Sequence, residues 1–196
     1  MYRLVSFLSI TEIPTKNKAI YLTFDDGPEP GITESILNIL QKYNAKATFF
    51  CTGENFEKHP GLVQLIKENG HVIGNHTYSH TNGLKEKYEN YIDDVIRTRE
   101  IIKTNLFRPP WGALSVRKFL KISKCNRIIM WSISSSDTNS KTDWVKHCQW
   151  MVKRTKPGRI ILFHFSSKHS LNTMQILPKY LVEIQKLDYE FRAIQI

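Results

Sequence analysis

Apolar runs rich in β-branched and aromatic residues alternate along the chain with segments whose apolar residues recur at helical spacing. The runs predict strands at Ala19–Phe24, Ala47–Cys51, His71–Gly74, a short segment ending near Phe107, Arg127–Ile133, Arg159–His164 and Tyr189–Ile196. The periodic segments predict helices at Thr33–Tyr43, Leu62–Asn69, Lys85–Thr104, Ser115–Ser123, Thr142–Arg154 and Asn172–Lys186. Such alternation is typical of an α/β fold with a largely parallel sheet. Because this is too few strands for a regular eight-stranded barrel, we expect a distorted, incomplete (β/α) barrel with about seven strands.

Local signals mark several helix ends. Thr33 is the candidate N-cap of the first helix, Pro60 precedes the second, and Gly70 follows it. Pro178 lies inside the last predicted helix, so that helix is expected to kink there or to start late.

The bulk composition is that of one folded domain spanning residues 1–196. Apolar residues make up 41% of the chain, yet no run of about 18 of them occurs, so no membrane span is predicted. Met1–Ile10 lacks a small-residue cleavage site and is too weak for a secretory signal peptide, so we interpret it as a strand or arm. The cellular location stays open between the cytoplasm and export by an unrecognised or removed signal. We expect a monomer.

The chain carries a formal net charge of +10, which favours encounter with polyanions such as nucleic acid or acidic cell-wall polymers. Its basic residues are scattered, and the densest group, from Lys153 to Arg159, flanks a turn without interleaved aromatics. We therefore do not expect nucleic-acid binding. The three cysteines stand at unrelated spacings and indicate neither a disulfide framework nor a thiolate metal site.

Two adjacent carboxylates follow the first predicted strand directly, and α/β folds place their chemistry at such strand ends. Asp25 and Asp26 precede Gly27 and Pro28, which turn the chain. Neighbouring side chains at a strand end point in different directions, so one carboxylate could bind a metal while the other transfers a proton. A turn with two exposed acids is the alternative if the segment is taken alone.

A pair of histidines follows the third predicted strand, at His76 and His80. Histidines four residues apart share one face of a helical turn and can bind one ion. Together with one of the aspartates they would form a site of two histidines and one carboxylate, with positions left for water and substrate. Two further clusters follow later strands: Arg108-Pro-Pro-Trp111-Gly after the fourth, and His164 at the end of the sixth.

These residues resemble the motifs of polysaccharide deacetylases, the carbohydrate esterase family that includes chitin, peptidoglycan and rhizobial nodulation-factor deacetylases. The resemblance rests on Thr23-Phe-Asp-Asp-Gly-Pro28 and His76-Thr-Tyr-Ser-His80, with Arg108–Gly112 and Leu162-Phe-His164 as further motifs. It implies that Asp25 is the catalytic base, and that Asp26, His76 and His80 bind a divalent metal, Zn²⁺ first and Co²⁺ as an alternative. It further implies that Arg108 tunes the base, the Trp111 backbone N–H binds the oxyanion, His164 is the general acid, and Leu162 lines the acyl pocket.

The fourth motif departs from the family pattern, since the chain reads Trp131-Ser-Ile-Ser-Ser-Ser-Asp137-Thr138. Asp137 matches the aspartate that orients the acid histidine. Thr138 stands where relatives commonly have a tryptophan that walls the acetyl pocket, and Ser134 also departs. We expect a wider acyl pocket around Thr138, unless another aromatic fills the gap: Phe163, Phe165 or Trp144.

The resemblance implies a metal-dependent hydrolase that removes N-acetyl groups from a glycan such as chitin or peptidoglycan and releases acetate. Tyr78 and Trp111 are candidates for stacking on sugar rings, although either could pack against a neighbouring loop. Two alternatives stay open. One is a hydrolase of the same fold acting on a non-sugar amide or an O-acetyl ester, and the other is a weakly active glycan-binding protein.

Overall fold

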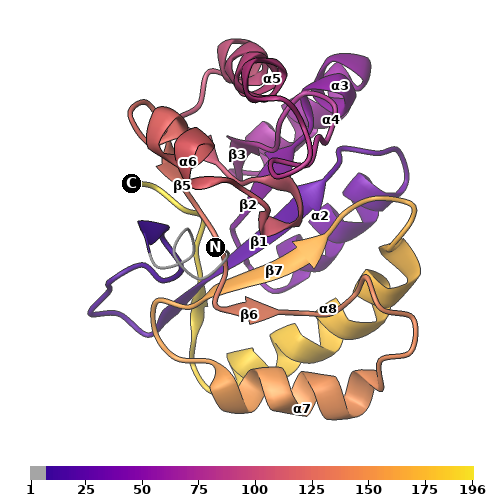
Figure 1. Ribbon diagram of the computed structural model, residues 1–196. Helices are drawn as coiled ribbons and strands as arrows, with labels where there is room; N and C mark the ends of the chain where they lie inside the picture. The colour runs from indigo at the N-terminus through magenta and orange to yellow at the C-terminus, as the bar shows by residue number, and fades with distance from the viewer. Residues whose placement is uncertain (1–7) are drawn as a thin grey trace.

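A curved parallel sheet forms the centre of the molecule in the computed structural model, which describes residues 8–196 (Figure 1). The strands run in the order β5-β4-β3-β2-β1-β7-β6, and β8 pairs with the beginning of β1. Their bounds are β1 Ala19–Asp26, β2 Ala47–Cys51, β3 Val72–Asn75, β4 Leu106–Phe107, β5 Arg127–Ile128, β6 Ile133–Ser134, β7 Ile160–His164 and β8 Glu190–Phe191. The sheet is an incomplete α/β barrel, as predicted.

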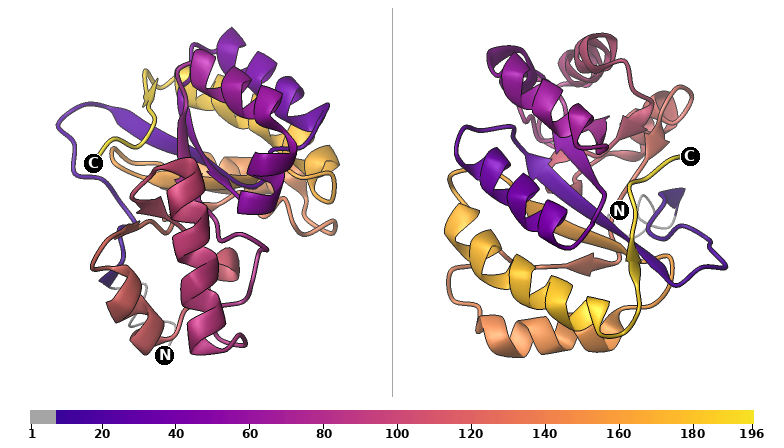
Figure 2. Two further views of the ribbon diagram at one scale, coloured as in Figure 1. Left: turned by 90° about the horizontal axis from the view of Figure 1, so that it is seen from above. Right: turned by 180° about the vertical axis from the view of Figure 1, so that it is seen from behind.

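Helices cover the outer faces of this sheet (Figure 2). They are α2 Ile32–Lys42, α3 Gly53–Lys58, α4 Pro60–Glu68, α5 Tyr88–Ile102, α6 Val116–Ile122, α7 Trp144–Arg154 and α8 Ser170–Gln185, with a short 3₁₀ helix, η1, at Pro110–Gly112. Figure 2, right, shows α2, α8 and α7 side by side over one face, where their apolar stripes and the strands form the largest core cluster. A second cluster lies beneath α5 and α6.

The central strand β1 determines where the carboxyl ends of its neighbours lie. It is buried on both faces from Ala19 to Asp25, as its continuous apolar run predicts, and it pairs in register with β2 and β7. In this register Asp25 lies beside His164 and Asp26 beside Cys51. Parallel pairing therefore brings the polar residues that end β1, β3 and β7 to a single edge of the sheet.

The prediction of one strand over Arg127–Ile133 was wrong, because this segment supplies two strands at opposite edges of the sheet. Between them the chain crosses the open side of the barrel. There the carbonyls of Ile129 and Met130 accept hydrogen bonds from the Arg108 guanidinium, at 3.1 and 3.0 Å, instead of from a neighbouring strand. An apolar run alone does not reveal such a competing donor.

Smaller differences concern element ends. Helix α2 begins one residue early with Gly31 at its N-cap, and the Thr33 hydroxyl instead bonds the backbone of Glu29, so Thr33 is not the N-cap. Helix α3 was not predicted, and α8 starts at Ser170 and runs through Pro178 without the late start considered. The last strand is reduced to two residues. Of the predicted N-terminal strand or arm, residues 1–7 lie outside the described part, while Ile10 forms an isolated bridge with Ile129.

Candidate active site

A groove opens at the carboxyl edge of the sheet and contains most of the predicted site residues. It is lined by Asp25, Asp26, Glu29, Thr52, Glu54, Asn55, His76, Tyr78, Ser79, His80, Trp111, Trp131, Thr138, Leu162, His164, Ser166, Lys168 and His169. Arg108 and Asp137 are fully buried directly behind it. The sequence motifs, which span some 140 residues of chain, therefore meet in one place.

Asp26, His76 and His80 converge on the floor of this groove. The Asp26 Oδ1 atom lies 3.1 Å from His80 Nε2 and 3.5 Å from His76 Nε2. Burial raises the pKa of Asp26, but the hydrogen bonds from both imidazoles outweigh it and hold the pKa well below its usual range. The His76 Nδ1–H donates to the Arg108 carbonyl at 2.8 Å, so Nε2, which faces Asp26, is the nitrogen that can give up its proton and bind a metal.

The loop that carries the two histidines is not helical, contrary to the expectation from their spacing. Thr77 and His80 have left-handed backbones with φ of 65° and 55°, and Asp26 and Trp111 across the groove have φ of 91° and 55°. Non-glycine residues adopt such values rarely, and they concentrate at functional sites. The side chains of His76 and His80 therefore meet through a strained turn.

These three side chains fit a divalent metal. Their candidate ligand atoms all lie within 4.8 Å of one another. In a tetrahedral zinc site with metal–ligand bonds of about 2.1 Å, two donor atoms lie about 3.4 Å apart. The distances from Asp26 Oδ1 to the two imidazole nitrogens, 3.1 and 3.5 Å, are close to this value. Two imidazole nitrogens and a carboxylate oxygen also form the donor set of open catalytic zinc sites.

Asp25 forms a buried ion pair behind the three candidate metal ligands. Its Oδ1 accepts from Arg108 Nη1 at 2.7 Å, and its Oδ2 lies 3.8 Å from His76 Nε2. Burial lowers the pKa of Arg108, and the charge of Asp25 opposes that effect. The guanidinium is held further by the Thr23 hydroxyl at 2.8 Å and by the ring of Phe50, whose centroid lies 4.2 Å from its carbon.

His164 and Asp137 form a second buried pair at the opposite wall. His164 Nδ1 lies 2.8 Å from Asp137 Oδ1, and Asp137 Oδ2 accepts from the His164 backbone N–H and the Thr173 hydroxyl at 2.7 and 2.8 Å. Burial lowers the pKa of His164, but the Asp137 carboxylate outweighs it and, with Asp25 and Asp26, raises the pKa to about 9. The pair keeps a proton on this imidazole. Its other nitrogen, Nε2, remains available to a ligand in the groove.

The two aromatic candidates for sugar stacking differ in their surroundings. Trp111 is 59% exposed and meets the His80 ring at 4.3 Å between centroids. The Tyr78 ring is covered on one face by the Arg97 guanidinium at 3.4 Å, and its hydroxyl donates to Glu57. The structure thus favours the packing alternative for Tyr78, while Trp111 keeps surface for a ligand.

Thr138 and Leu162 both line the groove, and Leu162 is only 4% exposed. The aromatic residues considered as replacements for the missing tryptophan pack into the core instead: Phe163, Phe165 and Trp144. The rings of Trp131, His164 and His169 also line the groove. The His169 ring lies against His164, with centroids 5.4 Å apart.

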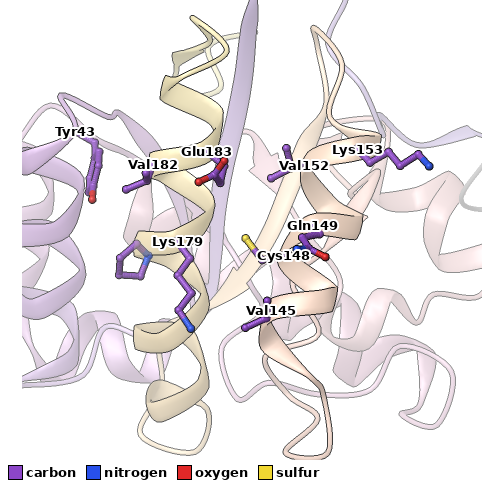
Figure 3. Close-up of a pocket in the computed structure, with 10 residues that line it drawn as sticks. Tyr43, Val145, Cys148, Gln149, Val152, Lys153, Lys179, Val182 and Glu183 are labelled. Atoms are coloured by element: carbon purple, nitrogen blue, oxygen red, sulfur yellow. The ribbon is translucent and has the colours of Figure 1, made fainter.

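A second hollow lies on the outer surface between α7 and α8 (Figure 3). Val152 and Cys148 of α7 face Val182 and Glu183 of α8 across it. It shares no residue with the groove at the sheet edge.

Comparison with known proteins decides the family. Residues 12–127 match the family model described as polysaccharide deacetylase. This chain belongs to the polysaccharide deacetylase family. It is 35% identical over 187 residues to a peptidoglycan-N-acetylglucosamine deacetylase of Bacillus cereus, covering 92% of this chain and 88% of that protein. The family assignment confirms the expected enzyme class, a polysaccharide N-deacetylase.

Longer and structurally characterised relatives agree with this assignment. The chain is 31% identical over 199 residues to a peptidoglycan-N-acetylglucosamine deacetylase of Listeria monocytogenes, with 97% of this chain and only 41% of that protein aligned. A crystal structure of a peptidoglycan N-acetylglucosamine deacetylase superposes with a TM-score of 0.86 at 31% identity, covering 94% of this chain and 89% of that one.

The sequence analysis did not identify the residues that hydrogen-bond Arg108 and Asp137 beneath the groove. The Thr23 hydroxyl accepts from Arg108. The Thr173 hydroxyl donates to the Asp137 carboxylate, and the Asn172 amide donates to the Asp137 carbonyl. Thr23 is the first residue of the Thr23–Pro28 motif, so the sequence did contain a signal for it. Asn172 and Thr173 lie on the first turns of α8 and carry no signal of their own in the sequence.

Proposed function

We propose that the chain forms one catalytic domain, a metal-dependent deacetylase that removes N-acetyl groups from N-acetylglucosamine-containing glycans and acts on peptidoglycan in particular. One observation carries the proposal. A donor set for a divalent metal, a carboxylate base beside an arginine, and a histidine paired with a buried aspartate share one groove. The names of the relatives support peptidoglycan as the substrate.

Asp26, His76 and His80 hold the metal, Zn²⁺ or alternatively Co²⁺, which when bound supplies Lewis-acid polarisation of the acyl oxygen and acidifies a water molecule. Asp25 accepts the proton of the attacking water. Arg108 stabilises the charged carboxylate and occupies its Oδ1, which leaves Oδ2 for this transfer.

The remaining residues stabilise charge and complete the proton transfers. The Trp111 backbone N–H donates to the oxyanion that develops on the acyl group. His164 then gives its proton to the departing nitrogen, because an amine leaves far more readily than an amide anion. The C–N bond breaks, and acetate and a free amino sugar form. Leu162 and Thr138 surround the acetyl methyl group, and the exposed Trp111 ring contacts the sugar.

The test is acetate release by the purified, metal-reconstituted protein. Peptidoglycan fragments, chitin oligomers, acetylated xylan and a small N-acetyl amide form the substrate panel. We expect release from the N-acetylglucosamine substrates, loss after chelation and recovery on adding Zn²⁺ or Co²⁺. The variant His76→Ala should bind no metal tightly. Release only from xylan or the small amide, or glycan binding without any release, would contradict the proposal.

A further inference from the structure

The loop from His76 to Thr81 carries two of the three proposed metal ligands but belongs to no helix or strand. Side chains instead accept several of its backbone N–H groups. Thr77 N–H donates to the Asn75 side chain at 2.8 Å, and Thr81 N–H donates to the Thr77 hydroxyl at 3.2 Å. These acceptors lie within or beside the loop. The carbonyls of Thr77 and Tyr78 accept from backbone N–H groups at the start of α3, which anchors the first half of the loop.

Asp94, which lies on the middle of α5, connects the second half of this loop, residues 79–81, to the rest of the fold. Its carboxylate accepts from the Ser79 backbone N–H at 3.5 Å, from the Ser79 hydroxyl at 3.3 and 3.4 Å, and from the Thr81 hydroxyl. Ser79 and Thr81 are the residues immediately before and after His80. One carboxylate therefore holds both neighbours of a metal ligand.

The same face of α5 contacts the loop a second time. Arg97, one turn after Asp94, covers the Tyr78 ring at 3.4 Å and pairs with Glu57 of α3. His80 itself has a φ of 55°, a conformation that a histidine adopts rarely without surrounding restraint. The anchoring of residues 78–81 on α5, together with the bonds from α3 to residues 77 and 78, supplies that restraint.

We propose that Asp94 is a positioning residue for the metal site, which fixes the His80 imidazole beside Asp26 before the metal binds. This inference rests on the proposed metal-dependent function. Without the Asp94 carboxylate, residues 79–81 lose their hydrogen-bond acceptor on α5. The free-energy cost of ordering His80 must then be met when the metal binds, which weakens the metal affinity. Residues that orient a metal ligand typically change metal affinity by about 10–100-fold.

Asp94→Ala tests the role, with Asp93→Ala as the matched control. Asp93 is the adjacent exposed carboxylate on α5, so the two variants change the same helix and the net charge equally. Zn²⁺ affinity is measured by competition with a chromophoric chelator, and the ligand-field spectrum of bound Co²⁺ reports the geometry. We expect about 10–100-fold weaker Zn²⁺ binding and an altered Co²⁺ spectrum for Asp94→Ala alone. Asp94→Asn, which keeps one acceptor oxygen, should fall between Asp94→Ala and the wild type.

A second variant guards against a folding defect in α5. The double variant Ser79→Ala/Thr81→Val removes the hydroxyl donors from the loop and leaves α5 untouched, and it should weaken Zn²⁺ binding in the same direction. Equal Zn²⁺ affinity in Asp94→Ala, Asp93→Ala and the wild type would overturn the positioning role alone. A wild-type protein that binds no Zn²⁺ would overturn the proposed metal site itself, and the positioning role with it.

Discussion

Replacing Asp137 by asparagine removes the negative charge that faces His164 in the buried pair. The pKa of His164 is about 9 with this carboxylate in place, against an ordinary value of 6.5, and burial alone would lower it. A general acid works only while protonated, so activity is lost as the pH rises through this pKa. The alkaline limb of kcat/KM should therefore move to lower pH in Asp137→Asn.

The size of the effect follows from the two pKa values. At pH 8 a histidine of pKa about 9 is roughly 90% protonated and one of pKa 6.5 about 3%, which predicts a roughly 30-fold loss of rate. At pH 6 both remain mostly protonated, and the loss from protonation should be less than about twofold. A cation bound in the groove would lower the pKa of His164 in both proteins, so the test compares the position of the alkaline limb in Asp137→Asn with that in the wild type.

The assay is acetate release between pH 5 and 10 at a fixed free metal concentration. Asp93→Asn, an exposed carboxylate on α5, controls for the lost charge and should reproduce the wild-type profile. An asparagine can also orient the imidazole wrongly, which would lower the rate equally at every pH. An alkaline limb at the same pH in Asp137→Asn and the wild type would show that Asp137 does not set the pKa of His164.

Three further variants test other parts of the site. Asp25→Asn should retain bound metal, measured by elemental analysis, and lose about 10²–10⁴-fold in kcat; near-normal turnover would exclude Asp25 as the base. Arg108→Met leaves Asp25 buried without its partner and should destabilise the fold by about 3–5 kcal/mol in urea unfolding. A loss below about 1 kcal/mol would show that water replaces the guanidinium. Thr138→Trp should steepen the fall in rate from N-acetyl to N-propionyl and N-butyryl substrates, and identical profiles would show that Thr138 does not line the acyl pocket.

The parts of the fold that could be predicted are those determined by local pattern. The buried strand β1 is a mainly apolar run that ends in two aspartates, and parallel pairing alone then places Asp25, His76 and His164 near one edge. Between β5 and β6, the carbonyls of Ile129 and Met130 accept hydrogen bonds from a guanidinium some twenty residues earlier in the sequence, a contact that no local pattern could indicate.

The same distinction separates the residues of the site from those that hold them. The proposed ligands, base and acid lie at strand ends or just after them, where residue type and position together are informative. Asp94 and Thr173 lie on helices, among other polar residues of the same kinds. Only the packing of α5 and α8 brings them into contact with the histidine loop and with Asp137. Asp93 and Asp94 are indistinguishable in the sequence, yet only Asp94 faces the histidine loop.

The altered fourth motif changes one wall of the groove and leaves the proton-transfer pair intact. Asp137 is fully buried, and its carboxylate accepts from both the ring and the backbone of His164 and from Thr173. Each of these donors comes from β7 or from the first turns of α8, and none depends on the side chain of Thr138. Thr138, where the resemblance implies a tryptophan, should therefore affect which acyl groups fit, a difference of roughly 1–3 kcal/mol per methylene, and leave the alkaline limb unmoved. Thr138→Trp and Asp137→Asn accordingly act on separate observables, acyl selectivity and pH dependence, and a variant of either residue that moved both would contradict this division.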